Sequence, residues 1–257
     1  RVLTFGSNDN GELGIGTSDA STHEFVRATS LTGAIDISAG GFPPGSGSGI
    51  GGSMIVAFSD GHVSGWGENS YGELGFGDTT QRLTPATTWL PSSHGGLMIT
   101  QVEWGESHCA MLDANGEVWT PGDNTHGQLG RGTLGVAETS WGQVTGLTGK
   151  VVTQISCGAR TTLFVINDGT VWAVGDGSGH RLGQTIYVMA GSHTVTPTQI
   201  PAVSNVVEAR QVGTVSWFRT SEGRLFFNGS CGGNGQISVV GGGPTTGTSG
   251  PFPLETP

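Results

Sequence analysis

The sequence predicts an all-β fold built from a repeated unit of about 50 residues. A glycine-rich motif, clearest in GENSYGELGFG at residues 67–77, occurs five times in the 257 residues. Its first glycines, spaced 61, 55, 53 and 54 residues apart, are Gly6, Gly67, Gly122, Gly175 and Gly229. Leucines follow the first four at the same offset, as Leu13, Leu74, Leu129 and Leu182. A nucleotide-binding glycine loop occurs once and opens a helix, so the recurrence excludes that interpretation.

A second marker runs in phase with the first. In each later copy, two apolar runs flank a short turn that ends in glycine, as in VAFSDGHVSGWG. The turn glycines, spaced 55, 53 and 54 residues apart, are Gly61, Gly116, Gly169 and Gly223. Asp-Gly and Asn-Gly pairs favour tight two-residue hairpin turns, because glycine adopts positive φ without steric cost. We therefore expect a β-hairpin in every repeat, preceded by one further strand.

The composition agrees with short strands joined by glycine turns. The 48 glycines disfavour helices, and only 12% of the residues are charged, unlike a disordered acidic chain. The net charge is −10 and no basic run occurs, which disfavours a nucleic-acid partner. No apolar stretch approaches the about 20 residues of a membrane-spanning helix. We expect neither nucleic-acid binding nor membrane insertion.

The order of the motifs resembles the RCC1 (regulator of chromosome condensation) repeat. That repeat has a strand ending in glycine, a second strand, Asp-Gly, V-x-x-W-G, x-N-x-x-G-x-L-G-x-G and a later proline. The clearest copy is SDGHVSGWGENSYGELGFGDTTQRLTP at residues 59–85. The resemblance covers nearly the whole chain. It implies a β-propeller of four-stranded blades, of which family members typically have seven.

We expect a single propeller domain over residues 1–257, with about five blades visible. A half repeat at 1–33 begins at its third strand, VLTFG, and complete repeats follow at about 34–90, 99–148, 151–201 and 205–257. Two alternatives remain open: a small five-bladed ring, or part of a longer chain with a larger, for example seven-bladed, ring. The C-terminal segment GGGPTTGTSGPFPLETP has no apolar pair to supply the missing strands, which favours the second.

Two features are candidates for contact with a partner protein. The segment GGFPPGSGSGIGG at 40–52 contains ten residues that the other repeats lack, so we expect a projecting loop. It is either a contact loop, through Phe42, Pro43 and Pro44, or a tolerated insertion. The tryptophans Trp89, Trp141 and Trp217 depart from the repeat register. They are either interface anchors, where tryptophan is enriched, or partly buried packing residues.

The sequence predicts no catalytic, cofactor-binding or metal site. His108 falls on a second strand, where burial is expected, and His126 and His180 lie in glycine loops without a carboxylate-rich cluster. Carboxylates that recur with the repeat argue against catalysis, because catalysis needs one asymmetric constellation. The cysteines are expected to be buried or inert thiols, because Cys109, Cys157 and Cys231 occupy different repeat positions.

The leading functional hypothesis is therefore a non-enzymatic interaction or structural module that binds other proteins, with homo- or hetero-oligomers as its assemblies. The glycine-rich composition with a single lysine, Lys150, favours an extracellular or virion-surface setting, such as a component of a phage or viral particle. The resemblance implies two alternatives. One is a guanine-nucleotide exchange regulator of a small GTPase, and the other is a secreted inhibitor or receptor-binding propeller.

Overall fold

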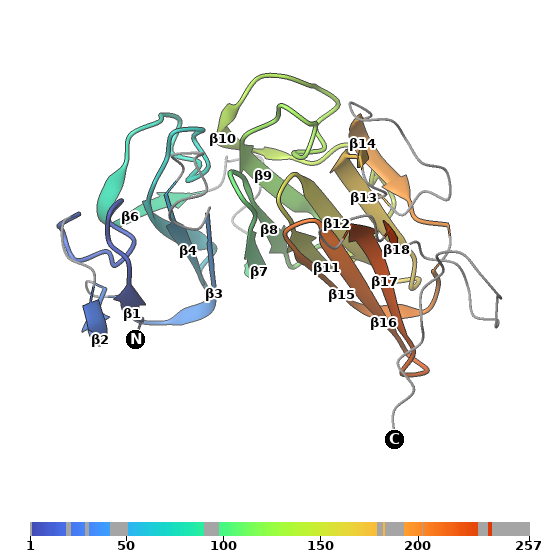
Figure 1. The fold of residues 1–257 in the computed structure, drawn as a ribbon, viewed down its shortest axis with the longest axis horizontal. Helices are drawn as coiled ribbons and strands as arrows, with labels where there is room; N and C mark the ends of the chain where they lie inside the picture. The colour runs from blue at the N-terminus through green and yellow to red at the C-terminus, as the bar shows by residue number, and fades with distance from the viewer. Residues whose placement is uncertain are drawn as a thin grey trace. The chain divides into compact units, whose positions relative to one another are not determined.

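A computed structural model describes residues 2–18, 22–28, 31–41, 51–89, 98–178, 182, 193–201, 203–230 and 236–237. These residues form one two-stranded and four four-stranded antiparallel sheets (Figure 1), which confirms the expected all-β fold. Contacts divide the chain into two compact units, which we call the first unit (1–123 with 136–143) and the second unit (124–135 with 144–257). Within the described ranges, no helix is long and apolar enough to cross a membrane.

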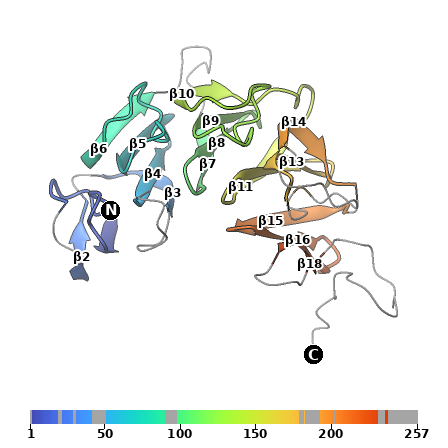
Figure 2. The same ribbon diagram turned by 45° about the horizontal axis from the view of Figure 1, so that its top comes forward.

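The first unit holds three sheets (Figure 2), in which each strand pairs with the next one along the chain. The half repeat forms β1 (Leu3–Gly6) and β2 (Thr22–Arg27). The first complete repeat forms β3 (Ala34–Gly40), β4 (Ser53–Phe58), β5 (His62–Gly67) and β6 (Arg82–Trp89). The next forms β7 (Ile99–Trp104), β8 (Cys109–Asp113), β9 (Val118–Gly122) and β10 (Glu138–Gln143).

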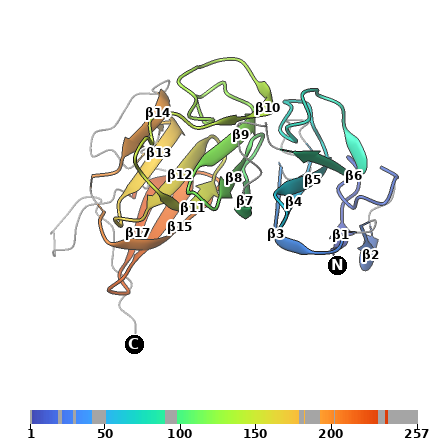
Figure 3. The same cartoon turned by 180° about the vertical axis from the view of Figure 1, so that it is seen from behind.

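The second unit holds two sheets with the same sequential order (Figure 3). One consists of β11 (Val152–Cys157), β12 (Thr161–Ile166), β13 (Val171–Asp176) and β14 (His193–Gln199). The other consists of β15 (Val206–Val212), β16 (Val215–Thr220), β17 (Leu225–Ser230) and β18 (Gln236–Ile237). Every four-stranded sheet thus falls within one of the complete repeats expected from the sequence.

The hairpin turns have three residues, not the two that the sequence suggested. Between β8 and β9, the Gly116 amide donates to the Asp113 carbonyl and the Asp113 amide donates to the Glu117 carbonyl, both at 3.0 Å. Gly116 has φ 79°, while the Asn115 before it keeps negative φ. This is a β-turn closed by one left-handed glycine. The expectation of a two-residue turn was wrong because that turn needs positive φ at a non-glycine residue as well.

The central strands of the sheets carry much of the apolar core of each unit. All residues of β8 and β12 are buried. In the first unit Ile55, Leu74 and Met111 belong to one apolar cluster, and in the second unit Leu163 and Phe218 belong to another. Burial of each such side chain contributes roughly 1.5–3 kcal/mol, so these clusters supply much of the stability of each unit.

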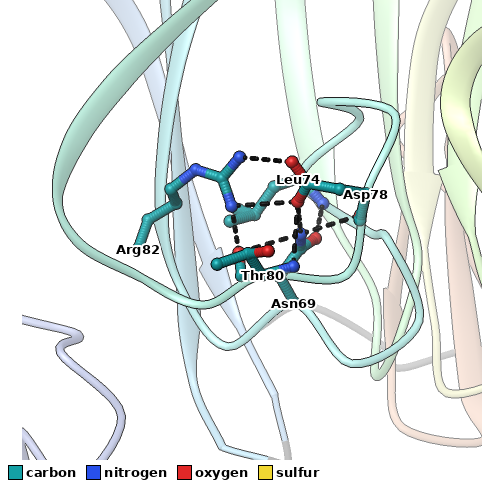
Figure 4. Close-up of polar contacts among 5 residues, drawn as sticks. All are labelled: Asn69, Leu74, Asp78, Thr80 and Arg82. Carbon is teal, nitrogen blue, oxygen red and sulfur yellow. Dashed lines mark hydrogen bonds and ion pairs between the residues drawn. The ribbon is translucent and has the colours of Figure 1, made fainter.

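The glycine loops share one hydrogen-bonded structure, organised by an asparagine (Figure 4). The Asn69 side chain accepts a hydrogen bond from the Leu74 amide at 2.9 Å and donates to the carbonyls of Asp78 at 3.0 Å and Thr80 at 3.1 Å. Arg82 closes the loop with two hydrogen bonds to the Asp78 carboxylate, at 2.9 and 3.0 Å, and another to the Thr80 carbonyl. The Arg82 bonds lower the pKa of Asp78 to about 2.

Two other loops repeat the asparagine bonds. The amides of Leu13 and Leu129 donate to the side-chain oxygens of Asn8 and Asn124 at 3.0 and 3.3 Å. All three asparagines are buried. The fourth copy has Gly177 at this position, so its loop lacks the amide side chain.

Each described glycine loop docks on the fourth strand of the following sheet. The amides of Gly16, Gly77 and Gly132 donate to the carbonyls of Leu83 in β6, Thr139 in β10 and Val195 in β14, each at 2.8 Å. The loops also accept hydrogen bonds from that sheet: Trp66 donates to the Glu12 carbonyl and Thr162 to the Gln128 carbonyl, both at 2.8 Å. The glycine motif is therefore the connector between successive sheets.

We predict that Asn69→Ala destabilises the protein by roughly 2–4 kcal/mol. The change removes an acceptor and two donors and leaves the buried Leu74 amide without its partner. Urea-induced unfolding, followed by circular dichroism, measures the loss. Asn115→Ala, at an exposed turn residue of the same unit, is the matched control and should change the stability by less than about 0.5 kcal/mol. Equal effects of the two changes would contradict the organising role of Asn69.

Candidate interaction surface

Most of the residues proposed from sequence as partner contacts lie outside the described structure. Phe42, Pro43 and Pro44 fall between residues 41 and 51 of the described ranges, and so does most of the 40–52 segment. Trp89 ends β6, but its side chain is not among those described. The contact roles of these residues therefore remain predictions.

Trp141 is a packing residue, which corrects its proposal as a surface anchor. Its side chain is 4% exposed and belongs to the core cluster of the first unit. The reason is the docked loop: a Cβ atom added to Gly75 would lie 2.2 Å from Trp141 Nε1, so the glycine backbone covers the indole. Of the two alternatives left open by the sequence, packing is the one that the structure supports here.

Trp217 is half-buried on β16, between the buried residues Ser216 and Phe218. Its strand partners are Arg210 on β15 and Phe227 on β17. Trp217 lies in the second unit and Trp141 in the first. The described contacts therefore do not bring the sequence-predicted tryptophans together, and a shared binding face remains a prediction.

The described thiols and His108 are structural, as the sequence predicted. Cys109 and Cys157 are buried and form no disulfide, whereas Cys231 lies outside the described residues. The Cys109 thiol donates to the Glu73 carbonyl at 3.0 Å, which is the bond that the Thr162 hydroxyl makes in another repeat. Full burial lowers the pKa of His108 to about 4, so its imidazole is neutral at physiological pH.

Glu73 is a buried carboxyl group within its glycine loop. It is 1% exposed, and its Oε2 accepts a hydrogen bond from the Tyr71 amide at 2.8 Å. Burial, assisted by the nearby charges of Glu68 and Asp123, raises its pKa to about 7 despite the backbone hydrogen bonds. The equivalent residue of the next loop is the neutral Gln128, which accepts the same bond from the His126 amide at 2.9 Å. Glu73 therefore serves as a structural acceptor.

The second unit places a basic side-chain cluster where a glycine loop meets the following sheet. We call His126, Arg160 and His193 the imidazole–arginine cluster. Arg160 Nη1 lies 3.3 Å from His126 Nε2, and the rings of His126 and His193 meet edge to face with centroids 5.0 Å apart. Thr125 Oγ1 lies 2.9 Å from His126 Nδ1 and orients that ring. The members are His126 in the glycine loop, Arg160 immediately before β12, and His193 at the start of β14.

The cluster is asymmetric within the repeat. Asn10 and Tyr71 occupy the loop position of His126, and Gly52 and Ser107 occupy the strand position of Arg160. Asp176, the strand partner of His193, directs its carboxylate to the Ser178 amide at 2.8 Å. Arg160 is exposed to solvent.

Arg160 donates to His126 Nε2, because a guanidinium has no acceptor, and the donors of an exposed guanidinium suit a carboxylate or another anion. Within the described part of the chain, no group of three or more His, Cys, Asp or Glu residues could hold a metal ion. The sequence pointed to His126 alone. It could not reveal the cluster, because three separate segments meet there.

Comparison with known proteins agrees with the repeat architecture. A family model described as the regulator of chromosome condensation (RCC1) repeat matches residues 60–112 and 115–165, and a second model of the same description matches residues 99–128. The chain is an RCC1-repeat protein. The matched segments contain the glycine loops that begin at Gly67 and Gly122.

The RCC1-repeat relatives are longer than this chain. The probable E3 ubiquitin-protein ligase HERC3 of Homo sapiens is 36% identical over 190 residues, which are 71% of this chain and 16% of HERC3. The ultraviolet-B receptor UVR8 of Arabidopsis thaliana is 28% identical over 244 residues, 93% of this chain and 50% of UVR8. The chain therefore spans half or less of the length of these curated relatives.

Solved structures show the same fold. Yeast RCC1 (Prp20), solved bound to Kap60, superposes with a TM-score of 0.77 at 20% identity, covering 99% of this chain and 57% of Prp20. Human WBSCR16 superposes with a TM-score of 0.65 at 17% identity, covering 98% of this chain and 79% of WBSCR16. The RCC1-type β-propeller expected from the sequence is thereby confirmed.

We predict that Glu73→Gln changes how stability depends on pH. The folded-state pKa of about 7 lies above the ordinary value of 4.5, so the contribution of Glu73 to wild-type stability is complete below pH 4.5 and is lost as the pH rises through 7. Glutamine does not titrate, so the variant should exceed wild type by up to about 3 kcal/mol at pH 8 and match it near pH 4.5. Urea unfolding between pH 4.5 and 8 measures the difference.

The converse change, Gln128→Glu, provides the control. It places a carboxyl group at the equivalent buried position, so it should add a loss of stability at high pH that wild type lacks. The His108 contribution is lost as pH falls from 6.5 towards 4, but it is common to all three proteins and cancels. Parallel pH curves for wild type and Glu73→Gln would contradict the raised pKa.

We predict that Gly75→Ala is more destabilising than Gly33→Ala. Both glycines have similar positive φ, 76° and 82°, so both variants incur the same backbone strain of about 1–2 kcal/mol. Only the Cβ at Gly75 collides with Trp141; nothing lies within 4 Å of one at Gly33. The difference between the unfolding free energies of the two variants measures the cost of the collision between the added Cβ and the Trp141 indole. Equal unfolding free energies would contradict the close approach of the loop to the indole.

Proposed function

We propose that the chain is a non-enzymatic protein–protein interaction module whose imidazole–arginine cluster binds an acidic segment of a partner protein. The observation that carries this proposal is the asymmetry of the cluster. Asn8, Asn69, Glu12 and Gln128 recur with the repeat and form hydrogen bonds inside their own loops. In contrast, the equivalent positions in the two preceding repeats hold Gly52 and Ser107 in place of arginine. Arg160 is exposed and lies beside two histidines.

The geometry suits a carboxylate. A guanidinium presents a planar set of donors that matches the two oxygens of a carboxylate, and charge-assisted hydrogen bonds of this kind are the stronger ones. His126 holds one edge of the Arg160 side chain, which reduces the conformational freedom lost on binding. Because the whole chain carries a net charge of −10, an acidic partner needs such a local basic site. Binding should weaken with salt, since the cluster is near the surface.

The similar proteins support an interaction role. Yeast Prp20 is bound to Kap60 in one solved structure. A second structure, of Prp20 from Saccharomyces cerevisiae, is described together with its binding properties to Gsp1p and histones. In each case an RCC1-type chain is a protein that binds other proteins. For this chain we propose the same general role, with a partner that the cluster chemistry selects.

We extend the proposal to a large assembly. A chain with 48 glycines and one lysine suits an extracellular or particle-bound component, such as part of a phage or viral particle, in which the module contacts copies of itself or of other proteins. The alternative of a GTPase regulator depends on the 40–52 segment, of which residues 42–50 lie outside the described structure. It stays a prediction, as does the alternative of a secreted inhibitor.

We predict that Arg160→Glu reduces capture of the partner about tenfold or more. Carboxyl-directed cross-linking of native material, read out by mass spectrometry, identifies the neighbours, because one lysine gives amine reagents almost no target. The purified partner is then titrated against the variants at fixed salt. A tenfold loss corresponds to about 1.4 kcal/mol, which is reasonable for charge reversal at an interface.

Arg219→Glu is the matched control. Arg219 is an exposed arginine of the same unit, 3.0 Å from Glu208, and lies outside the cluster. Its reversal makes the same change in net charge and should leave partner affinity within about twofold. Equal losses for both variants would show a general charge effect, and no loss at Arg160 would reject the cluster as the binding site.

A further inference from the structure

Arg160 holds the imidazole of His126 in its neutral form. Arg160 Nη1 lies 3.3 Å from His126 Nε2, and a guanidinium carries donors alone, so Nε2 is the acceptor and carries no proton. The ring proton is therefore on Nδ1, which lies 2.9 Å from Thr125 Oγ1 and donates to that hydroxyl. The protonation state of the ring thus follows from its two neighbours.

Protonation of His126 in this arrangement would bring two donors together. An imidazolium has an N–H on each ring nitrogen, so its Nε2–H would meet an Arg160 N–H across the same 3.3 Å. Like charges this close repel each other, and the hydrogen bond between the two side chains would be lost. Without a bound anion, Arg160 and a proton therefore compete for one nitrogen atom.

A bound carboxylate removes this competition. One of its oxygens can accept from Arg160 and the other from His126 Nε2–H, and its negative charge offsets both cations. Both side chains can be reached, because Arg160 is exposed and His126 is half-buried. His126 is then protonated in the complex and neutral in the chain without its partner, so formation of the complex takes up a proton.

The direction of the pH effect follows by linkage. A ligand whose binding takes up a proton binds more tightly when protons are more abundant, so the affinity rises as the pH falls. Histidine ordinarily exchanges its proton at about pH 6.5, which places the effect between neutral and mildly acidic pH. The gain ends where His126 is already protonated before the anion arrives.

The elements packed around the loop of His126 contribute few other charged groups. The loop contacts β12 through the Thr162 bond to the Gln128 carbonyl and contacts β14 through the Gly132 amide. The charged or titratable residues of the loop and of the described segments beside it are Arg131, Arg160, Asp176 on β13 and His193 on β14. The acidic member, Asp176, accepts a hydrogen bond from the Ser178 amide at 2.8 Å.

His193 is the other imidazole beside His126, and its surroundings favour His126 as the site of proton uptake. The two rings meet edge to face, with centroids 5.0 Å apart. His193 Nδ1 is buried and has no hydrogen-bond partner in the described part of the chain. A charged His193 ring would leave the N–H at this atom without an acceptor, which is unfavourable for a buried group.

The pairing of imidazole with guanidinium distinguishes this interface from its equivalents. In the two preceding repeats the same positions hold Asn10 with Gly52 and Tyr71 with Ser107. Neither of these pairs changes charge near neutral pH. Among these three equivalent loop–strand contacts, the proton-sensitive pair occurs in the second unit alone.

We propose that the imidazole–arginine cluster couples the binding of its acidic partner to the uptake of one proton at His126. The partner is then held more tightly at mildly acidic than at neutral pH. This inference rests on the proposed function, because it requires an anion at the cluster. It adds the regulation of that site by pH, which a guanidinium alone would not provide.

Titration with an acidic peptide tests the proposal. The probe is octa-aspartate with a pH-insensitive dye, because aspartate, with an ordinary pKa of about 3.9, stays ionised above pH 5.5. We expect its Kd for the wild-type chain, measured by fluorescence anisotropy at fixed salt, to fall at least about fivefold from pH 7.5 to 5.5. Calorimetry at pH 6.5 in two buffers with different heats of ionisation should show net proton uptake on binding, up to one proton.

His126→Gln is the decisive variant. Glutamine retains an acceptor for Arg160 but does not titrate, so the change in Kd between pH 7.5 and 5.5 should shrink to less than about twofold. His62→Gln is the matched control, because His62 lies in the first unit beside Asp60 and outside the cluster. This control should keep the wild-type pH dependence. Circular dichroism verifies folding, and if His126→Gln does not fold, the calorimetry of the wild-type chain decides.

The outcomes separate this inference from the proposed function. If Arg160→Gln weakens binding about tenfold but the wild-type Kd is equal at pH 7.5 and 5.5, the inference is overturned and the proposed function stands. If octa-aspartate binds wild type and Arg160→Gln equally, or binds neither, both are rejected. A pH dependence that persists in His126→Gln and disappears in His193→Gln would assign the proton to His193 and overturn the role of His126.

Discussion

The fold depends on one buried side-chain amide in each of three glycine loops. Glycine-rich segments lose more conformational entropy on folding than other segments, so such a loop needs internal hydrogen bonds to hold one structure. Asn8, Asn69 and Asn124 provide them by accepting the leucine amide and donating to carbonyls further along. Once fixed, the loop presents its own amides and carbonyls to the next sheet, and sheets that share no strand become connected.

This connection explains which substitutions the repeat accepts. The loop carbonyl at Glu73 or Gln128 needs a donor from the next sheet, and Cys109 or Thr162 supplies it from equivalent positions. In the preceding repeat Met54 occupies this position and has no donor. There the indole of Trp66, its partner across the β4–β5 pair, donates to the Glu12 carbonyl instead. The hydrogen bond is kept while the residue that makes it changes.

The sequence predicted what local chemistry and period determine. Glycine spacing located the hairpins, and the strand register placed His108 and Cys109 inside. The length of the hairpin turns was predicted wrongly, because Asp-Gly occurs in both two-residue and three-residue turns. The two alternatives for Trp141 stayed open because its burial depends on Gly75, a contact across two sheets. The imidazole–arginine cluster joins residues 126, 160 and 193, which sequence spacing does not link.

The proposed binding surface is itself a consequence of the repeat. At the imidazole–arginine cluster, the residues differ from their equivalents in other repeats, but the glycine loop docks on the next sheet in the same way. The docked loop therefore places new side chains at the edge of this interface without loss of packing. A polar departure from the repeat suits recognition by charge, because an exposed guanidinium presents donors that match the two oxygens of a carboxylate.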